Sequence, residues 1–457
     1  MKKTVIYIIL SGWMLAGCGT YSRYHRPDLS TENLYRDMPA DIDTMTIASL
    51  SWREMFTDPK LQSLIETGLE RNADLNVARL RVEAAEAVLM TARLSYLPSL
   101  GLTAEGNANK HDGATAKTYN VGASASWELD IFGKLTAAKR GAAARELGTA
   151  LQGSRAYRQA VQTQLVATIA DSYYTLAMLD AQMTISNRTL ENWRTTVRTL
   201  EALKKVGKSN EAGVLQAKAN VMRLEASLLS IRKSISETEN ALSAILAMPS
   251  HSIGRSDLAE AAFPDTVSIG VPLQLLSNRP DVRQAEMELA QAFYATNAAR
   301  AAFYPNITLS GILGWTNNGG GVIVNPGQWL LNAIGSLTQP LFNRGVNIAN
   351  LKIAKSRQEE AKLLFRQSLL NAGKEVNDAL TAWQTAKSQI EINARQVETL
   401  CDAVRKTESL MRHSNTTYLE VLTAKQSLLE AEVQQLQTRF ERIQSIIKLY
   451  HALGGGM

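Results

Sequence analysis

The chain consists of two copies of one unit, and this duplication limits its possible folds more than any other feature of the sequence. Residues 72–78 (Asn-Ala-Asp-Leu-Asn-Val-Ala) match 279–285 (Arg-Pro-Asp-Val-Arg-Gln-Ala) at an offset of 207 positions. The same offset relates further positions along the chain: Ala92-Arg93 and Ala299-Arg300, Asp171 and Asp378, and 214–218 and 421–425. Well-separated matches at one spacing predict two copies of a supersecondary unit.

The N-terminus has the layout of an export signal. Two lysines precede an apolar stretch at 4–15, which is too short to span a bilayer and has the length of a signal-peptide core. The run at 15–18 (Leu-Ala-Gly-Cys) then resembles a bacterial lipoprotein lipobox, in which Cys18 becomes the first mature residue and is acylated. The alternative is a chance cysteine behind a plain secretory signal. Gly19 stands where an aspartate would retain many lipoproteins at the inner membrane, which favours the outer membrane.

The duplication and the signal together predict the division of the chain. We expect a signal peptide at 1–17, a lipid-anchored N-terminal segment at 18–60, a first repeat at 61–248, an inter-repeat linker at 249–277, a second repeat at 278–453 and a C-terminal tail at 454–457.

Each repeat reads as helix, strand, strand, long helix, turn and helix. No proline occurs between Pro98 and Pro249 or after Pro340. Because a proline inside a helix costs about 3 kcal/mol, these stretches permit very long helices. We expect them at about 133–206, 211–247, 345–412 and 418–453. The first would be roughly 110 Å long at 1.5 Å per residue, so it must project from any compact body.

The returning helix of each repeat carries an apolar stripe with a spacing of three or four residues. The stripes are Val221, Leu224, Leu228, Ile231, Ile235, Leu242 and Ile245 in the first repeat, and Leu429, Val433, Leu436, Phe440, Ile443, Ile447 and Tyr450 in the second. This spacing is typical of coiled coils, although an ordinary core stripe on a long helix has the same pattern. Its presence in both repeats favours coiled-coil packing between the rods. The two stripes lie one position out of phase when the repeats are aligned.

Residues 118–131 alternate between apolar and polar side chains, which predicts a strand with one apolar and one polar face. The strand is longer than usual and suits a tilted passage through a membrane. We expect further strands at about 98–109, 305–317 and 328–342, the last with poor alternation. The polar face would line a pore with Asn120, Ser124, Ser126, Glu128 and Asp130.

Four strands are too few to close a barrel in lipid, where about eight strands is the practical minimum. An open sheet edge in hydrocarbon leaves backbone groups unpaired at a cost of several kcal/mol each. Several copies must therefore join edge to edge, and the strand pattern leaves open whether two, three or four do so. The predicted fold class is mainly α with membrane β, built from a duplicated helix-strand-strand-helix-helix unit.

Residue patterns of catalysis, metal binding and nucleic-acid binding are missing from the sequence. The five histidines stand far apart, and no nucleophile elbow or phosphate-binding loop occurs. Basic residues are scattered, and the net charge is only +6. With Cys18 acylated, Cys401 has no disulfide partner. We therefore expect no enzymatic activity, no cofactor, no metal site and no nucleic-acid partner.

Several groups of residues carry a resemblance to a known family. They are Tyr24-His-Arg-Pro27; Trp52 with Asp58-Pro-Lys-Leu61 and Asn72-Ala-Asp-Leu75; Trp127-Glu-Leu-Asp-Ile-Phe-Gly-Lys134 with Gln339-Pro-Leu-Phe342; Val271-Pro-Leu-Gln-Leu-Leu276 with Asn278-Arg-Pro-Asp281; and Tyr418-Leu-Glu-Val-Leu422 with Ala452-Leu-Gly-Gly-Gly456. On these residues the chain resembles an outer-membrane efflux protein of the TolC-like family, in its lipoprotein branch. The resemblance implies a homotrimer, with a trimeric 12-stranded β-barrel in outer membrane lipid continued by a long periplasmic α-barrel of coiled-coil helices.

The resemblance also implies partners and a function. The duct would passively conduct drugs or other small molecules, received from an inner-membrane RND-type transporter through a periplasmic adaptor (membrane fusion) protein. Two alternatives remain open at this point: an exit duct for protein secretion, and a structural coiled-coil lipoprotein that tethers the envelope. A tether would need no alternating strands.

The turns between the long helices receive roles from the same resemblance. Leu419 matches an apolar position that constricts the closed periplasmic end in the family. At Thr423 relatives often carry an acid, so the departure in this chain puts a cation-binding ring in doubt. Exposed polar turn residues are candidates for adaptor contact, although simple solvated turns have the same composition: Lys208, Ser209, Asn210, Asn415, Thr416 and Thr417.

Overall fold

A computed structural model describes residues 22–27, 50–111, 113–143, 149–207, 209–261, 263, 279–316, 328–412 and 418–455. The chain divides into two compact units, each of which draws on both repeats. We call one of them the sheet unit, which comprises Met1–Ser30, Arg79–Tyr157 and Asp281–Ser368. The other, the bundle unit, comprises Thr31–Ala78, Arg158–Pro280 and Leu369–Met457.

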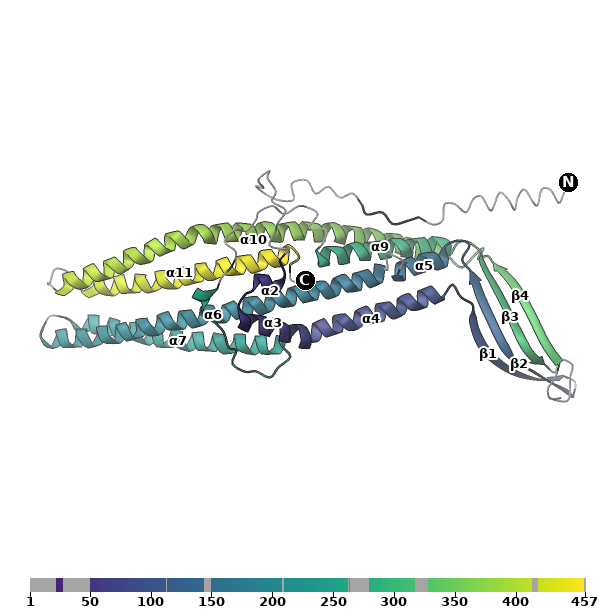
Figure 1. Cartoon of the computed structure of the whole chain (residues 1–457), viewed down its shortest axis with the longest axis horizontal. Helices are drawn as coiled ribbons and strands as arrows, with labels where there is room; N and C mark the ends of the chain where they lie inside the picture. Colours follow the sequence, from purple (N-terminus) through teal and green to yellow (C-terminus); the bar gives the residue numbers. More distant parts are fainter. Residues whose placement is uncertain are drawn as a thin grey trace. The chain divides into compact units, whose positions relative to one another are not determined.

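The described residues of the sheet unit form one antiparallel sheet of four strands that lie in chain order (Figure 1). β1 (Ser99–His111) and β2 (Ala114–Leu129) form a hairpin in the first repeat. β3 (Asn306–Thr316) and β4 (Gln328–Thr338) form the matching hairpin in the second repeat. Because β2 pairs with β3, the two hairpins join into a single sheet with β1 and β4 at its edges.

The ends of β2 and β4 differ from the bounds predicted from the sequence. β2 begins at Ala114 instead of 118, because the hairpin ladder continues to His111 opposite Ala114. It ends at Leu129 instead of 131, before Asp130. β4 ends at Thr338 instead of 342, since Pro340 has no N–H group to donate to a ladder.

A helix leads into or out of every strand. α4 (Ala73–Leu94) precedes β1, and α5 (Lys134–Ala143) follows β2. In the second repeat α9 (Pro280–Ala301) precedes β3, and α10 (Val346–Arg412) follows β4. The long α10 contributes residues to both units. The equal order of elements in the two halves agrees with the duplication read from the sequence.

Residues 22–27, which we call the strap, lie along α9 within the sheet unit. The side-chain amide of Asn297 donates to the carbonyl oxygen of Ser22 at 2.9 Å and accepts a hydrogen bond from the Ser22 hydroxyl at 3.3 Å. Four residues later in the strap, Arg26 forms an ion pair with Glu286 at 3.7 Å. The strap therefore runs antiparallel to α9, with Ser22 toward the end of the helix that leads to β3.

Tyr24 is the apolar centre of the strap. Its ring packs edge to face on Phe293 of α9, with 5.7 Å between the ring centroids. Its hydroxyl oxygen is buried and has no hydrogen-bond partner among the described residues. Burial raises the pKa of this hydroxyl above its ordinary value, so Tyr24 stays protonated. Docking on α9 thus gives the segment Tyr24-His-Arg-Pro27 a structural role.

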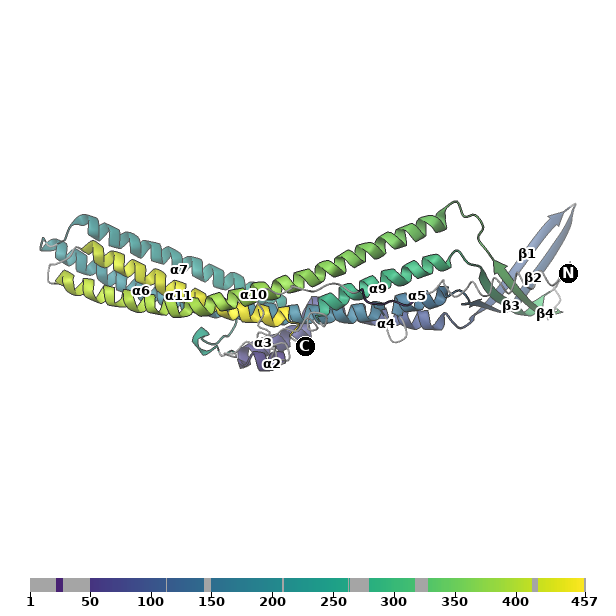
Figure 2. The same ribbon diagram turned by 90° about the horizontal axis from the view of Figure 1, so that it is seen from above.

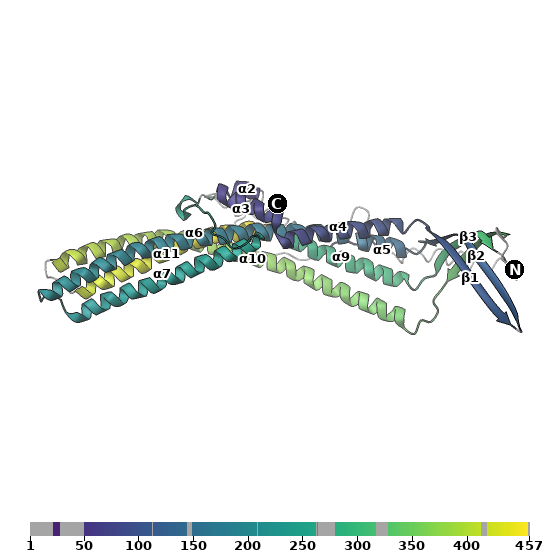
Figure 3. The same ribbon diagram turned by 90° about the horizontal axis from the view of Figure 1, so that it is seen from below.

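Four long helices make up most of the bundle unit. α6 (Thr149–Lys205) and α7 (Glu211–Ile245) come from the first repeat, whereas the second part of α10 and α11 (Tyr418–Ala452) come from the second. These helices run side by side in both views turned from Figure 1 (Figures 2 and 3). The expected rod at 133–206 corresponds to α5 and α6, and residues 144–148 lie outside the described ranges. Within those ranges, no helix offers enough length and apolar sequence to cross a membrane.

Arg255 fixes the segment that follows α7. Three shorter helices belong to the same unit: α2 (Trp52–Met55), α3 (Pro59–Arg71) and η3 (Leu258–Glu260). Arg255 donates two hydrogen bonds to the carboxylate of Asp180 on α6, at 2.5 and 2.8 Å. It also donates one to Glu239 on α7 at 2.6 Å. These hydrogen bonds, led by those to Asp180, raise the pKa of the guanidinium, which is itself largely buried.

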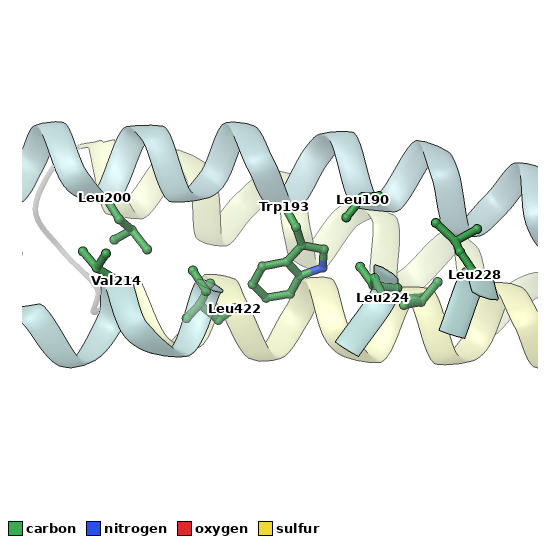
Figure 4. Packing of buried hydrophobic residues seen from close by; sticks show 9 residues of the cluster. Leu190, Trp193, Leu200, Val214, Leu224, Leu228 and Leu422 are labelled. Carbon is green, nitrogen blue, oxygen red and sulfur yellow. The ribbon is translucent and has the colours of Figure 1, made fainter. Parts of the chain in front are cut away.

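One buried apolar cluster of the bundle unit lies where three helices meet (Figure 4). Trp193 of α6 is its largest side chain and is almost completely buried. The other buried members come from all three helices: Leu190 and Leu200 from α6; Val214, Ala217, Leu224 and Leu228 from α7; and Leu422 and Leu429 from α11. The heptad stripes of both repeats therefore contribute to one shared interface.

The phase shift between the two stripes has a structural cause. α7 buries one face, which includes Leu224 and Ile231. The positions of α11 that are equivalent in the repeat carry the small residues Ala431 and Thr438, and these are buried as well. The large apolar residues of α11 lie on a neighbouring face that is also largely buried, with Leu429, Phe440, Ile443, Ile447 and Tyr450. α11 thus packs on two sides. Leu449 is buried on the side that α7 also buries, as the equivalent of Leu242, whereas most stripe residues of α11 occupy a side whose equivalent positions on α7 are mostly exposed.

Candidate functional site

One face of the sheet is apolar and exposed. The register places Leu102, Ala123, Leu313 and Leu331 side by side in one row. Other rows of this face add further large side chains that are exposed: Leu100, Val121, Trp127, Leu309, Trp315, Trp329 and Leu337. Soluble proteins rarely expose an apolar patch of this extent, so the face is built to be covered.

Tryptophans mark both ends of this apolar face. Trp315 and Trp329 contact each other with 5.0 Å between ring centroids, and Trp315 lies opposite Val121 of β2. Trp127 stands six residues further along β2, which corresponds to about 20 Å at roughly 3.3 Å per residue. Aromatic side chains at the two borders of an apolar band are typical of strands that cross a membrane.

The opposite face of the sheet is lined by small and polar side chains. Ser124 and Ser126, which the sequence predicts to face a pore, share this face with small residues of β1 and β3 and line a hollow of 340 Å³. Asn120 and Glu128 occupy even positions of the same strand and lie on this side as well. Four of the five predicted pore residues therefore share one face.

This polar face also contains residues that sequence reasoning missed. Glu105 of β1 lies opposite Asn120, and the alternation of β1 could have revealed it. Conversely, Ile312 of β3 and Leu330 and Ile334 of β4 are apolar residues on the polar face. Leu330 and Ile334 explain why β4 alternates poorly in sequence.

β2 and β3 approach each other closely at two glycines of the polar face. Gly122 lies opposite Gly314. A Cβ atom at Gly122 would lie 2.6 Å from the carbonyl oxygen of Leu313, and one at Gly314 would collide with the carbonyl group of Val121. Only glycine fits this approach, and such a pair permits a sheet to curve.

The two acids at the end of β2 are engaged locally. The carboxylate of Glu128 pairs with Lys134 at 2.7 Å. Asp130 lies just beyond the strand, and its carboxylate accepts from the backbone N–H groups of Leu135 and Thr136 at 2.8 and 2.7 Å. Because these are free N–H groups of the first turn of α5, Asp130 acts as the cap of that helix.

Replacing Asp130 with alanine should destabilise the start of α5 by about 1 kcal/mol, because two helix N–H groups lose their acceptor. Asp130→Asn keeps a side-chain oxygen and should retain most of the stability. The thermal midpoint of the purified protein, followed by circular dichroism, measures both variants. Equal midpoints for Asp130→Ala and the unmodified chain would show that this cap contributes nothing.

The turn between α6 and α7 contains three of the residues predicted to contact an adaptor. Asn210 is the N-cap of α7, and its side-chain oxygen accepts from the N–H of Gly213 at 2.9 Å. Lys204 and Glu211 form an ion pair across the turn. Ser209 is half-buried, and Lys208 lies outside the described residues, as do Asn415, Thr416 and Thr417 of the other turn.

The first two turns of α11 contain both predicted gate residues. Leu419 is 57% exposed, whereas the following Val421 and Leu422 are buried. The hydroxyl of Thr423 donates to the carbonyl oxygen of Leu419 at 2.9 Å. The polar group of Thr423 is therefore used within the helix, and the apolar side chain of Leu419 is the one that projects.

Lys425 holds this part of α11 against two other helices. Its ammonium group, largely buried, pairs with Glu408 of α10 at 2.7 Å and donates to Thr196 of α6 at 3.1 Å. Burial also raises the pKa of the nearby Tyr418 hydroxyl. The start of α11 is thus tied to both neighbours by polar contacts that the sequence did not suggest.

Asp171 and Asp378, which are equivalent in the two repeats, line one hollow of 830 Å³ in the bundle unit. Gln444 of α11 donates to Asp171 at 2.7 Å, and Lys374 pairs with Asp378 at 3.7 Å.

No group of His, Cys, Asp and Glu side chains in the described part of the chain is arranged to hold a metal ion. Cys18 falls outside that part, and Cys401 is a half-buried free thiol.

Comparison with known proteins agrees with this geometry. The model of the family described as "Outer membrane efflux protein" matches residues 64–248 and 271–455, so each repeat is matched separately. The chain is 31% identical to "Probable outer membrane lipoprotein SilC" of Salmonella typhimurium, with 100% of this chain and 99% of that protein aligned. It is 30% identical to "Cation efflux system protein CusC" of an Escherichia coli O6:H1 strain, over 97% of this chain and 96% of that one.

A solved structure shows the same fold. The outer-membrane channel OprN superposes with a TM-score of 0.86 at 27% identity, covering 96% of this chain and 99% of that one. The fold is therefore that of the TolC-like channels, and the chain is a channel protein and not an enzyme. On these matches, which cover both repeats, the chain belongs to the outer membrane efflux protein family.

Proposed function

We propose that three copies of this chain form the exit duct of a tripartite efflux pump in the outer membrane, with Cys18 as its acylated anchor. The observation that carries the proposal is the long antiparallel sheet with one apolar face bordered by tryptophans and one polar face. Such a sheet suits a wall between lipid and water. The duct is passive, and the energy comes from the inner-membrane transporter.

The free edges of the sheet support assembly from several copies. Neither β1 nor β4 pairs on its outer side with another strand of the described chain. In lipid each unpaired backbone group costs several kcal/mol, so β4 of one copy pairs with β1 of the next. Two copies would give about eight strands, whose interior is just wide enough for side chains. Three copies leave room for an aqueous passage.

The helix tips suit a gate and a contact with an adaptor protein. Leu419 projects from α11, and three copies would place three such side chains around one axis. The residues proposed to contact the periplasmic adaptor are those that the sequence places between the long helices: Lys208, Ser209, Asn210, Asn415, Thr416 and Thr417. The cargo class is small molecules or ions, in line with a relative that is named for cation efflux and a similar structure that is named as an outer-membrane channel.

Leu419→Ala should raise the passive leak of small solutes through the outer membrane severalfold, because the constriction loses three isobutyl groups. The rate at which intact cells hydrolyse a chromogenic β-lactam measures this leak. Leu215→Ala provides a matched control, since Leu215 of α7 is also 57% exposed. An unchanged rate in Leu419→Ala, or an equal rise in both variants, would exclude Leu419 as the gate.

The duct itself is tested with the purified lipidated protein. Trimers that withstand detergent and dissociate on heating, together with stepwise conductance in a planar bilayer, are the expected results. A structural tether would give neither. A monomer that stays in solution when Cys18→Ala prevents acylation would overturn the proposal, because the apolar face of the sheet would then need no lipid.

A further inference from the structure

The chain passes four times between sheet and helices in the sheet unit, at 95–98, 130–133, 302–305 and 339–345. The strand ladders place all four passages at the same end of the sheet, where α4, α5, α9 and α10 meet it (Figures 1 and 2). If the sheet spans the outer membrane, as the proposed function requires, these passages lie where the chain leaves the bilayer on the periplasmic side.

Large apolar side chains of the passages are exposed. Leu341 and Phe342 are 93% and 86% exposed, more than almost any other large apolar residue of the described chain. Exposed apolar residues occur in the other three passages as well, at Leu97, Ile131 and Phe303. Between them the rings of Phe132 and Tyr304 stack with 5.2 Å between centroids. Aromatic and aliphatic side chains next to an apolar sheet face suit the border of a membrane.

Each passage also has a cation within one or two residues of its helix end. Arg93 and Arg300 occupy equivalent positions in α4 and α9, Lys134 begins α5, and Arg344 precedes α10. Lys134 is neutralised by Glu128. The other three are exposed, and the structure gives them no ion pair or hydrogen-bond partner among the residues it describes.

Helix dipoles favour two of these arginines and disfavour the third. Arg93 and Arg300 lie in the last turns of their helices, where a positive charge is favourable. Arg344 lies in front of the first turn of α10, where a positive charge is unfavourable. It moreover has a left-handed backbone with φ of 46°, which a residue other than glycine adopts at a cost. What the three share is their place at one end of the sheet.

We propose that Arg93, Arg300 and Arg344, with the exposed apolar residues of the passages, form a collar that binds the headgroups of anionic phospholipids. The apolar side chains enter the outer part of the acyl region, and the guanidinium groups bind headgroup phosphates as bidentate donors. The carboxylates at this end do not compete, because Glu128 is paired with Lys134 and Asp130 caps α5. The collar thereby sets the depth of the sheet in the membrane.

The test uses the full-length lipidated protein in a neutral detergent. It is titrated with dioleoylphosphatidylglycerol or with dioleoylphosphatidylcholine, and the thermal midpoint of the trimer is followed. Phosphatidylglycerol should raise the midpoint at much lower concentration than phosphatidylcholine. In R93Q/R300Q/R344Q its half-maximal concentration should rise by about fivefold for each arginine, or on the order of a hundredfold in total. High salt should remove most of the difference.

Matched variants separate the collar from a general charge effect. R232Q/R366Q/K406Q removes the same charge from exposed helix positions and should bind phosphatidylglycerol like the unmodified protein. R93K/R300K/R344K keeps the charge and should restore binding to within a few fold. Inorganic phosphate should not compete, because it lacks the acyl chains that the collar contacts.

Three results would overturn the collar. One is unchanged phosphatidylglycerol binding by R93Q/R300Q/R344Q, and another is an equal loss in the charge-matched control. The third is loss of the trimer in R93Q/R300Q/R344Q before any phospholipid is added, which would assign the arginines to contacts between copies. Conductance of the unmodified protein, measured separately, decides the proposed function, so a failure of the collar leaves the duct intact.

Discussion

Gly314→Ala should prevent accumulation of the proposed trimer in the outer membrane. The added methyl group would collide with the carbonyl group of Val121 and with Gly122 on β2. These are backbone atoms held by the ladder on both sides, so they cannot turn away as a side chain would. The overpacking should cost about 3 kcal/mol or more per copy. Heat-dependent migration of outer-membrane extracts on gels measures the trimer.

Two glycines of the same sheet provide the controls. A Cβ atom at Gly106 would meet no other atom within 4 Å, and one at Gly335 would meet only the side chain of Leu309, at 3.6 Å. Gly106→Ala and Gly335→Ala should therefore form trimers at normal levels. A normal trimer from Gly314→Ala would mean that β2 and β3 are further apart than their register implies.

Trp193→Ala should destabilise the bundle unit by about 3–5 kcal/mol, the cost of deleting a buried aromatic side chain. Trp193 is 1% exposed and contacts residues of both neighbouring helices, so its removal leaves a cavity at the centre of the cluster in Figure 4. We expect a lower thermal midpoint by circular dichroism and faster proteolysis at the α6–α7 turn.

Trp193→Phe is the matched variant, because it keeps an aromatic ring in the same place. It should lose much less stability than Trp193→Ala. Conductance in planar bilayers should stay near normal at low temperature in both variants, since the sheet is untouched. Equal midpoints for Trp193→Ala and the unmodified protein would show that the three helices are not held together at this point.

The sequence predicted the plan of the fold because that plan rests on periodicity. Alternation in 118–131 gave a strand, and the offset of 207 positions gave the order of elements in the second half. Such patterns are local, so they can be read without knowledge of tertiary contacts. The same logic assigned Ser124 and Ser126 to the polar face of the sheet, on which the register places them.

Other features depend on contacts between residues that are distant in sequence, and the periodicity of a sequence does not predict such contacts. Asp130 continues the alternation, yet its carboxylate caps a helix, since the chain turns directly after Leu129. In the sequence, Lys425 cannot be told from an exposed lysine. In the structure it contacts α6 and α10 and is largely buried. The phase of the α11 stripe likewise needed knowledge of which helices flank it. Arg93 and Arg300 were visible as a repeated pair, but their surroundings appear only once the strand ends are known.

Docking of the strap on α9 limits the distance between the proposed lipid anchor at Cys18 and the sheet unit. Asn297 holds Ser22 by two hydrogen bonds, and four extended residues span at most about 14 Å. If Cys18 is acylated, as proposed, its acyl chains can therefore insert only a short distance from the place where α9 meets β3. Such an anchor would hold the sheet unit close to the membrane surface, and it could not serve as a long tether to a distant membrane.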